Sequence, residues 1–155
     1  SNAVKKQNLP VLAKRKDTQW AGLNPSQMGL GPAHEMAPIM QRNKFNISDI
    51  DNWEINEAFA GQVLGCIEAW KQDEYCQQEL GLEKAMGEIP HDKLNIDGGG
   101  VSLGHPVGAS GARIVLHLAN TLKQNNAKRG IASLCIGGGQ GGAMLIESAN
   151  TVGDA

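Results

Sequence analysis

The chain has 155 residues, which is enough for one domain with a single hydrophobic core. Hydrophobic residues make up 41% of it, and this excludes an intrinsically disordered chain. The net charge of −2 argues against a nucleic-acid-binding protein, which would carry a basic stripe. No apolar run approaches the ~20 residues that span a bilayer, so we expect neither nucleic acid nor a membrane as a partner.

The first residues and the cysteines bear on processing and location. No signal peptide opens the chain, and Ser1–Ala3 resembles the remnant of a cleaved purification tag, so we expect one domain over residues 4–155. The three cysteines, an odd number without disulfide-like spacing, predict a reducing, cytoplasmic location. Glycine is unusually frequent, with 20 residues, and twelve of them lie between Gly98 and Gly142.

Strands and helices are expected to alternate through the first half of the chain. Residues 9–21 predict an extended segment, and a turn follows it. Apolar residues recur at helical spacing over Met36–Met40, although Pro38 weakens this prediction. A short strand is expected at Asn52–Ile55. A second helix is predicted after it from the spacing of four apolar residues, Phe59, Val63, Ile67 and Trp70.

The second half begins with a polar stretch, residues 71–93, which we expect to run over the surface outside the core. Leu94–Asp97 predicts a buried strand end, and a glycine-rich stretch follows it. The helix expected at Ser110–Lys123 has apolar residues on more than one face, so we expect it to be buried on two sides. A strand at Ile131–Ile136, a glycine turn and a hairpin partner at Ala143–Glu147 complete the order.

The predicted order of elements is β-α-β-α-β-α-β-β. Alternating strands and helices are typical of an α/β domain. We therefore predict a mixed, mainly parallel five-stranded sheet, in which the final hairpin adds one antiparallel strand.

The glycine-rich loops do not fit a nucleotide-binding site. Gly137, Gly139 and Gly142 satisfy the pattern G-x-G-x-x-G after a strand, but a strand follows where a dinucleotide fold needs a helix. No Gly-Lys dipeptide occurs, and this excludes a Walker A loop.

Three polar residues, Asn56, His105 and Cys135, stand at the ends of predicted elements. Because sites in α/β sheets gather at the carboxyl ends of strands, these residues could serve proton transfer and oxyanion stabilisation. The backbone amides of Gly137–Gly139 could form a second oxyanion hole. Structural roles stay open for all three: a core thiol, a turn-packing imidazole and a helix cap. His117 is expected to be structural, and no cluster has the spacing of a metal site.

Longer motifs around these residues resemble the C-terminal signatures of the thiolases. They are Asn56–Ala60 (NEAFA), Gly98–Gly111 (GGGVSLGHPVGASG) and Cys135–Gly139 (CIGGG), and Met28–Pro32 (MGLGP) resembles a fourth. The resemblance implies a thiolase-like C-terminal half. It therefore also implies an acyltransferase of fatty acid metabolism, such as an acetyl-CoA acetyltransferase or a 3-ketoacyl-CoA thiolase.

The resemblance also implies a reaction and roles. Thiolases cleave 3-ketoacyl-CoA with CoA, or condense two acyl-CoA molecules by Claisen chemistry, so coenzyme A thioesters are substrates and no further cofactor is expected. By resemblance, His105 activates a nucleophilic cysteine, and Asn56 holds a water in the same oxyanion hole. Cys135 is the acid/base, with a pKa that neighbouring donors can lower from the ~8.5 of a free thiol, and the Gly137 N–H contributes to a second hole. The positions implied near the substrate are Met28, Ala58 and Phe59.

The nucleophilic cysteine of the thiolases belongs to an N-terminal half that this sequence lacks, together with the loop domain that holds CoA. Cys66 and Cys76 lie near a polar surface stretch, and neither has the surroundings of that nucleophile. We therefore expect the isolated chain to be inactive. We also expect it to associate through the apolar face of the helix at Ser110–Lys123, either as a homo-oligomer or with the missing half.

Two other classes remain at this stage. Condensing enzymes of the ketoacyl-synthase kind share the fold, but they place two histidines where Asn56 and Cys135 stand. The chain could also be a non-catalytic partner that binds acyl-CoA or another protein, and CoA binding would distinguish that partner from an inert fragment.

Overall fold

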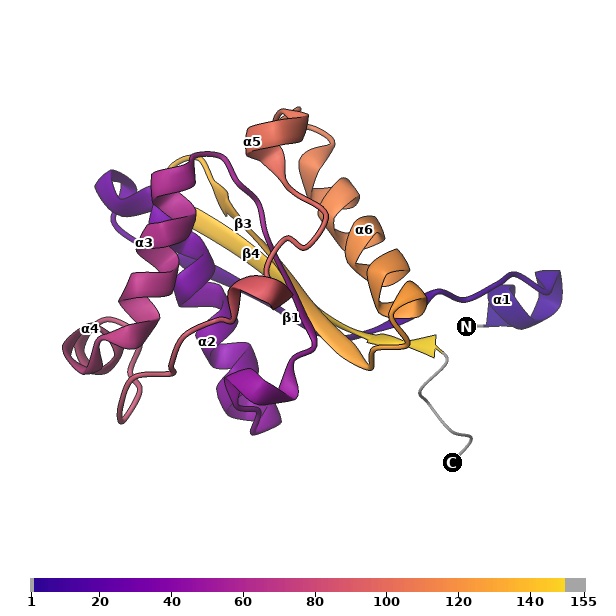
Figure 1. The fold of residues 1–155 in the computed structure, drawn as a ribbon, viewed down its shortest axis with the longest axis horizontal. Coiled ribbons are helices and arrows are strands. Elements are labelled where there is room, and N and C mark those ends of the chain that lie inside the picture. The colour runs from indigo at the N-terminus through magenta and orange to yellow at the C-terminus, as the bar shows by residue number, and fades with distance from the viewer. Residues whose placement is uncertain (1, 150–155) are drawn as a thin grey trace.

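The computed structural model describes residues 2–149, in which four strands form one mixed sheet (Figure 1). The strand order is β1-β4-β3-β2. β4 pairs antiparallel with both β1 and β3, while β2 and β3 run parallel. The strands are β1 (Ala13–Gly22), β2 (Asn52–Ile55), β3 (Arg129–Ile136) and β4 (Gln140–Ser148).

The α/β class is confirmed, but the prediction of a mainly parallel five-stranded sheet is wrong. The segment expected to form the extra strand makes only an isolated bridge, between Leu94 and Trp53. Asn95 ends the extended conformation because its φ of 45° lies in the left-handed region. Antiparallel pairing dominates because the tight turn after β3 returns β4 to the position between β3 and β1.

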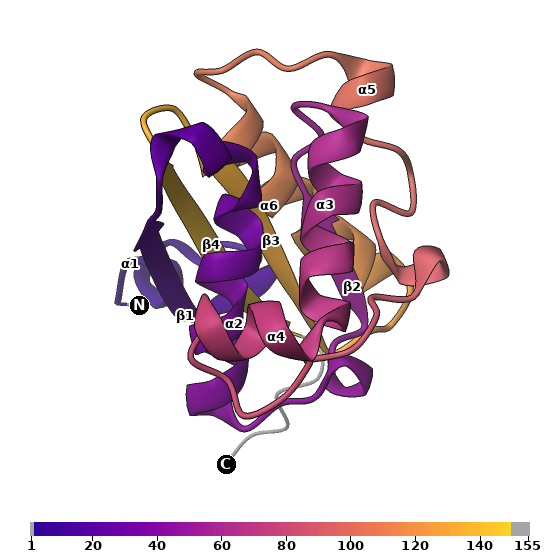
Figure 2. The ribbon, with the colours of Figure 1, turned by 90° about the vertical axis from the view of Figure 1, so that its left-hand side faces the viewer.

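Helices cover both faces of the sheet. α2 (Gly31–Asn43) and α3 (Ala60–Lys71) lie side by side on one face, and α6 (Ser110–Gln124) lies on the other (Figures 1 and 2). The shorter elements are α1 (Asn2–Gln7), η1 (Pro25–Leu30), η2 (Ile47–Asp49), α4 (Asp73–Gln78), η3 (His91–Lys93) and α5 (Gly100–Leu103). Among residues 2–149, no helix is both long and apolar enough to cross a membrane.

α2 continues through Pro38 although an interior proline removes a backbone hydrogen bond. Met36, Ile39 and Met40 on this helix are each at most 1% exposed and belong to the larger core cluster. Burying a side chain of this size contributes about 1.5–3 kcal/mol, so three of them outweigh the ~3 kcal/mol cost of the proline.

The polar stretch after α3 is not confined to the surface. Cys76 and Ile89 are 0% and 2% exposed, and Ile89 belongs to the larger core cluster. The segment folds back against the end of α3, where the Cys76 thiol donates to the Ala69 carbonyl oxygen at 3.5 Å. Cys66 is also buried, so both cysteines belong to the interior although they lie near a polar stretch of the sequence.

α6 buries Ile114, Leu118 and Leu122 against the sheet. Its opposite side is not covered: Leu116 is 57% exposed. A cavity of about 800 Å³ beside it is lined mainly by apolar side chains of α6, β4 and residues 4–15. In this chain the helix is therefore buried on one side, and the exposed apolar patch expected from the sequence is present.

Candidate active site

Asn56 and His105 come together although 49 positions separate them. Asn56 follows β2, and its backbone N–H donates to the Ser133 carbonyl oxygen on β3 at 2.9 Å. His105 lies in the loop between α5 and α6, with its Nε2 3.5 Å from the Asn56 Nδ2. The Asn56 side chain is 2% exposed, and its Oδ1 has no partner within the described residues.

One tautomer of His105 satisfies every hydrogen bond that its ring makes. The Ser110 hydroxyl donates to the Pro106 carbonyl oxygen at 3.1 Å, so the Ser110 Oγ accepts from the His105 Nδ1–H at 2.7 Å. The neutral imidazole then carries no proton on Nε2, which accepts from the Asn56 amide. His105 therefore presents a basic nitrogen beside a buried amide, which is the arrangement that a general base needs.

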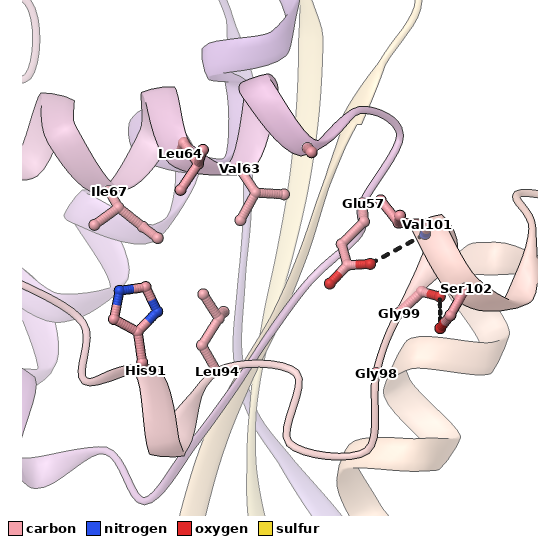
Figure 3. Close-up of a pocket in the computed structure, with 11 residues that line it drawn as sticks. Glu57, Val63, Leu64, Ile67, His91, Leu94, Gly98, Gly99, Val101 and Ser102 are labelled. Carbon is pink, nitrogen blue, oxygen red and sulfur yellow. Dashed lines mark hydrogen bonds between the residues drawn. The ribbon is translucent and has the colours of Figure 1, made fainter.

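Glu57 fixes the glycine-rich loop that precedes His105, a role that the sequence analysis missed. Its carboxylate accepts from the Asn95 Nδ2 at 2.8 Å. It also accepts from the Val101 backbone N–H at 3.0 Å (Figure 3). A Cβ on Gly99 would lie 2.5 Å from the Glu57 carboxyl carbon, and one on Gly100 would lie 2.6 Å from the Glu57 carbonyl oxygen. Two of the loop's glycines are therefore required by this contact. Glu57 lies inside the NEAFA motif, and its position there was the available signal.

Figure 3 also shows the cleft next to this loop, which has a volume of about 400 Å³. α3 contributes Val63, Leu64 and Ile67, while His91 and Leu94 line the other side. None of the sequence-predicted catalytic residues lines it. The cleft therefore supplies apolar surface near Glu57 but none of the predicted proton-transfer groups.

Cys135 lies near the end of β3, in the strand next to Asn56, and is 8% exposed. In the described part of the chain no hydrogen bond joins its thiol to Asn56 or His105. Its side chain shares the α2 face with Ser133 because strand residues two apart point the same way. Burial raises the pKa of the Cys135 thiol, so the lowering considered from the sequence does not occur here.

The turn after Cys135 is built from glycines with different surroundings. Gly138 and Gly139 have φ values of 85° and 80°, which favour glycine. Gly139 packs tightly against the Leu23 carbonyl oxygen and Pro25. Gly137 is exposed and has open space beside its Cα, so a ligand atom can approach its backbone closely.

The three positions implied near the substrate are not buried in a common pocket. Phe59 is 67% exposed at the start of α3, while Ala58 and Met28 are half-buried. Met28 lies in η1, which contacts α3. These side chains therefore border an open surface in this chain.

His117 links three elements, which agrees with its expected structural role. Its Nδ1 lies 2.7 Å from the Glu54 Oε1 on β2, and its Nε2 lies 3.1 Å from the Asp97 Oδ2 in the glycine-rich loop. Burial raises the pKa of Glu54, and the hydrogen bond to His117 opposes that shift. Among the described residues, no group of three or more His, Cys, Asp and Glu side chains is arranged to hold a metal ion.

The fold and these contacts define an α/β domain with a histidine, a buried amide and a buried thiol at one end of its sheet. Residues 9–148 match the family described as "Thiolase, C-terminal domain". The chain therefore belongs to the thiolase family, as its motifs predicted.

Named relatives agree with this assignment. The chain is 40% identical over 139 residues to a 3-ketoacyl-CoA thiolase of Aliivibrio fischeri, a match that covers 90% of this chain and 32% of the relative. It is 38% identical over 144 residues to an acetyl-CoA acetyltransferase of Cupriavidus necator, covering 93% and 32%. It is also 38% identical over 122 residues to the mitochondrial trifunctional enzyme subunit beta of Mus musculus, covering 79% and 26%.

Solved structures give the same result. The human mitochondrial 3-ketoacyl-CoA thiolase, determined in complex with CoA, matches with a TM-score of 0.78 and 36% identity, over 96% of this chain and 34% of that one. The acetyl-CoA acetyltransferase of Bacillus anthracis matches with a TM-score of 0.77 and 38% identity, over 96% and 33%. The chain spans about a quarter to a third of the length of these relatives.

Proposed function

We propose that this chain is the acid/base part of an acyl-CoA C-acyltransferase that cleaves 3-ketoacyl-CoA with CoA, or condenses two acyl-CoA molecules in the reverse direction. The observation that carries the proposal is the hydrogen-bond series from Pro106 through Ser110 to His105, which leaves a basic Nε2 beside Asn56. Family membership and the names of the relatives support the substrate class.

In the first half of thiolysis, a cysteine outside this chain gives its proton to the His105 Nε2 and attacks the 3-keto carbon. The bond between C2 and C3 of the substrate then breaks, which leaves an acyl-cysteine and the enolate of acetyl-CoA. His105 and a water held by Asn56 stabilise the enolate oxygen, and Cys135 gives its proton to the enolate carbon. The raised pKa of Cys135 suits this step, because the buried thiol stays protonated at neutral pH.

In the second half, the Cys135 thiolate takes the proton of an incoming CoA thiol. The CoA thiolate attacks the acyl-cysteine and releases acyl-CoA. The leaving cysteine thiolate takes back its proton from the His105 Nε2, so both thiols and the neutral imidazole are restored. The backbone N–H of Gly137, on the exposed turn, stabilises the negative oxygen of this step. Met28, Ala58 and Phe59 would contact the acyl and pantetheine parts of the substrates.

The proposal includes a partner. The nucleophile lies in the remaining two thirds of a thiolase, so this chain alone is inactive, and its uncovered α6 surface binds that part or a second copy. The exposed Leu116 and the apolar cavity beside α6 support this surface as the site of association.

The experiment is a thiolysis assay on a chimera in which this chain replaces the C-terminal third of the Aliivibrio fischeri relative. Acetoacetyl-CoA and CoA are the substrates. His105→Ala and Cys135→Ala are each expected to lower kcat by about 10²–10⁴-fold, the range of general acid–base catalysis. Cys76→Ala removes a buried thiol that bonds to the Ala69 and Trp70 carbonyl oxygens at the end of α3, and it is the matched control, with kcat unchanged. A Cys135→Ala chimera that keeps the parent kcat contradicts the assigned role.

A further inference from the structure

Glu35 is a buried carboxyl group that the proposed mechanism does not use. It projects from α2 and is 0% exposed. The Ser133 hydroxyl donates to its Oε1 at 2.7 Å, while its Oε2 has no partner among residues 2–149. Burying a glutamate with one carboxyl oxygen left without a hydrogen bond lowers the stability of the fold, so a function for this side chain has to be considered.

The surroundings of Glu35 are the strand ends that carry Cys135. Its Oε2 lies against Gly141, where a Cβ would collide with the carboxylate, so only glycine fits there. Gly141 is the cross-strand partner of Cys135. The first residue of α2, Gly31, would bring a Cβ within 3.4 Å of the Cα atoms of both Cys135 and Gly141. α2 therefore begins directly over this pair and carries Glu35 one turn further along.

Ser133 and Cys135 share a face of β3, so the carboxyl group held by Ser133 lies on the same side of the sheet as the Cys135 thiol. We propose that Glu35 is a positioning residue for Cys135: its carboxyl group fills the space that a side chain at Gly141 would take, next to Cys135 on the neighbouring strand, and the charge it carries there governs how readily the Cys135 thiol gives up its proton. The inference rests on the proposed acid/base role of Cys135, since that role gives the protonation of the thiol its consequence.

Electrostatics support the direction of the effect. Burial raises the pKa of Glu35 from 4.5 to about 8, against the opposing hydrogen bond from Ser133. Once ionised, the carboxylate raises the pKa of Cys135, and it acts on Cys66 in the same way. Near neutral pH the neutral form of Glu35 therefore leaves Cys135 free of a neighbouring negative charge.

The cation of β3, Arg129, stands at the far end of that strand and pairs with Glu147, and it makes no ion pair with Glu35. α3 presents Cys66, and η1 has no charged residue. β4 has one charged side chain, Glu147, at its far end. The charged residues of β1 stand at its beginning, and Asp17 is the nearest of them to Glu35. Asp17 pairs with Arg42, which lies two helical turns beyond Glu35 on α2. Cys135 and Cys66 are therefore the titratable groups that respond to Glu35.

The test measures the alkylation rate of each cysteine by iodoacetamide from pH 6 to pH 10, with mass spectrometry resolving the sites. It uses this chain, as native protein and as Glu35→Gln, which is neutral at every pH. The ratio of the variant's Cys135 rate to the native rate is expected to be about 1 at pH 6.5 and about three- to tenfold at pH 9.5, corresponding to a pKa difference of up to one unit. The buried Cys76 reports opening of the fold, and its rate is not expected to rise in the variant.

A second variant keeps the test independent of how well Glu35→Gln folds. The native plot of Cys135 alkylation rate against pH is expected to change slope, here called the break, at the pH where Glu35 ionises. Ser133→Ala removes the hydroxyl that favours the carboxylate, so this break is expected to lie at higher pH than in the native chain. A Cys135 rate ratio that stays the same at every pH overturns the proposal, because a purely structural role predicts that result. A break that does not move in Ser133→Ala also overturns it. Neither readout requires thiolysis, so the proposed function can fail separately.

Discussion

Replacing Glu57 by alanine tests whether one side chain holds the glycine-rich loop that leads to His105. The substitution leaves the Asn95 Nδ2 with its bond to the Ile55 carbonyl oxygen alone, and it leaves the Val101 N–H without its acceptor. Hydrogen bonds to a charged group contribute about 1.5–3 kcal/mol each. Because Glu57 is only half-buried, the lower end of that range applies, and we expect a total loss of about 2–3 kcal/mol.

Two measurements on Glu57→Ala check this prediction. Urea denaturation gives the free energy of unfolding, and hydrogen exchange gives the protection of the Val101 amide, which is expected to disappear in the variant. Glu68→Ala is the matched control, because Glu68 is an exposed glutamate that pairs with Lys71, and we expect a loss of less than about 0.5 kcal/mol. A loss below that value in Glu57→Ala, with Val101 still protected, refutes the reasoning.

Three further predictions concern stability and association. The Glu35 carboxyl group ionises near pH 4.5 in the unfolded chain and near pH 8 in the folded chain, so the free energy of unfolding of the native protein falls between these pH values. Glu35→Gln is therefore expected to be more stable than the native protein by about 2–4 kcal/mol at pH 8 but not at pH 4.5. An equal difference in urea denaturation at both pH values contradicts this. Arg42 lowers the pKa of Asp17 to about 2, so Asp17→Asn is expected to lower the free energy of unfolding by about 1 kcal/mol at pH 7. This loss is expected to vanish as the pH falls from 4 to 2, and a loss that persists at pH 2 argues against the ion pair. The native chain is expected to self-associate and Leu116→Lys to be monomeric in light scattering after size exclusion, whereas a monomeric native chain contradicts self-association through the α6 surface.

Elements with a strong local pattern were predictable from the sequence. The strand Asn52–Ile55 is observed with the predicted bounds, and α6 ends one residue beyond its predicted end. In both, the period of the apolar residues matches the way in which the element packs on its neighbours. α2 shows the limit of this reasoning, because burial of its apolar residues outweighed the helix-breaking tendency of Pro38.

Features that depend on distant contacts were not predictable. Leu94–Asp97 has the composition of a strand, but the left-handed Asn95 ends it, and the Asn95 side chain bonds both backbone groups of Ile55 in place of a strand partner. Cys76 is buried because its segment folds back on the end of α3, which no local pattern indicates.

The candidate site shows the same division. The sequence motifs indicated Asn56 and His105, and the structure brings these two side chains together. Glu57, Ser110 and Glu35 were missed because their roles arise from partners on other elements: the glycine-rich loop, the His105 ring and the strand that carries Cys135.

The most direct test of the central claim is a thiolysis assay with acetoacetyl-CoA and CoA. It is carried out on this chain alone and then after addition of the separately produced N-terminal part of a thiolase. If this chain supplies the acid/base groups and the other part the nucleophile, no turnover occurs alone and turnover appears on mixing. Turnover by this chain alone would contradict the account, because Cys135 would then have to serve as the nucleophile.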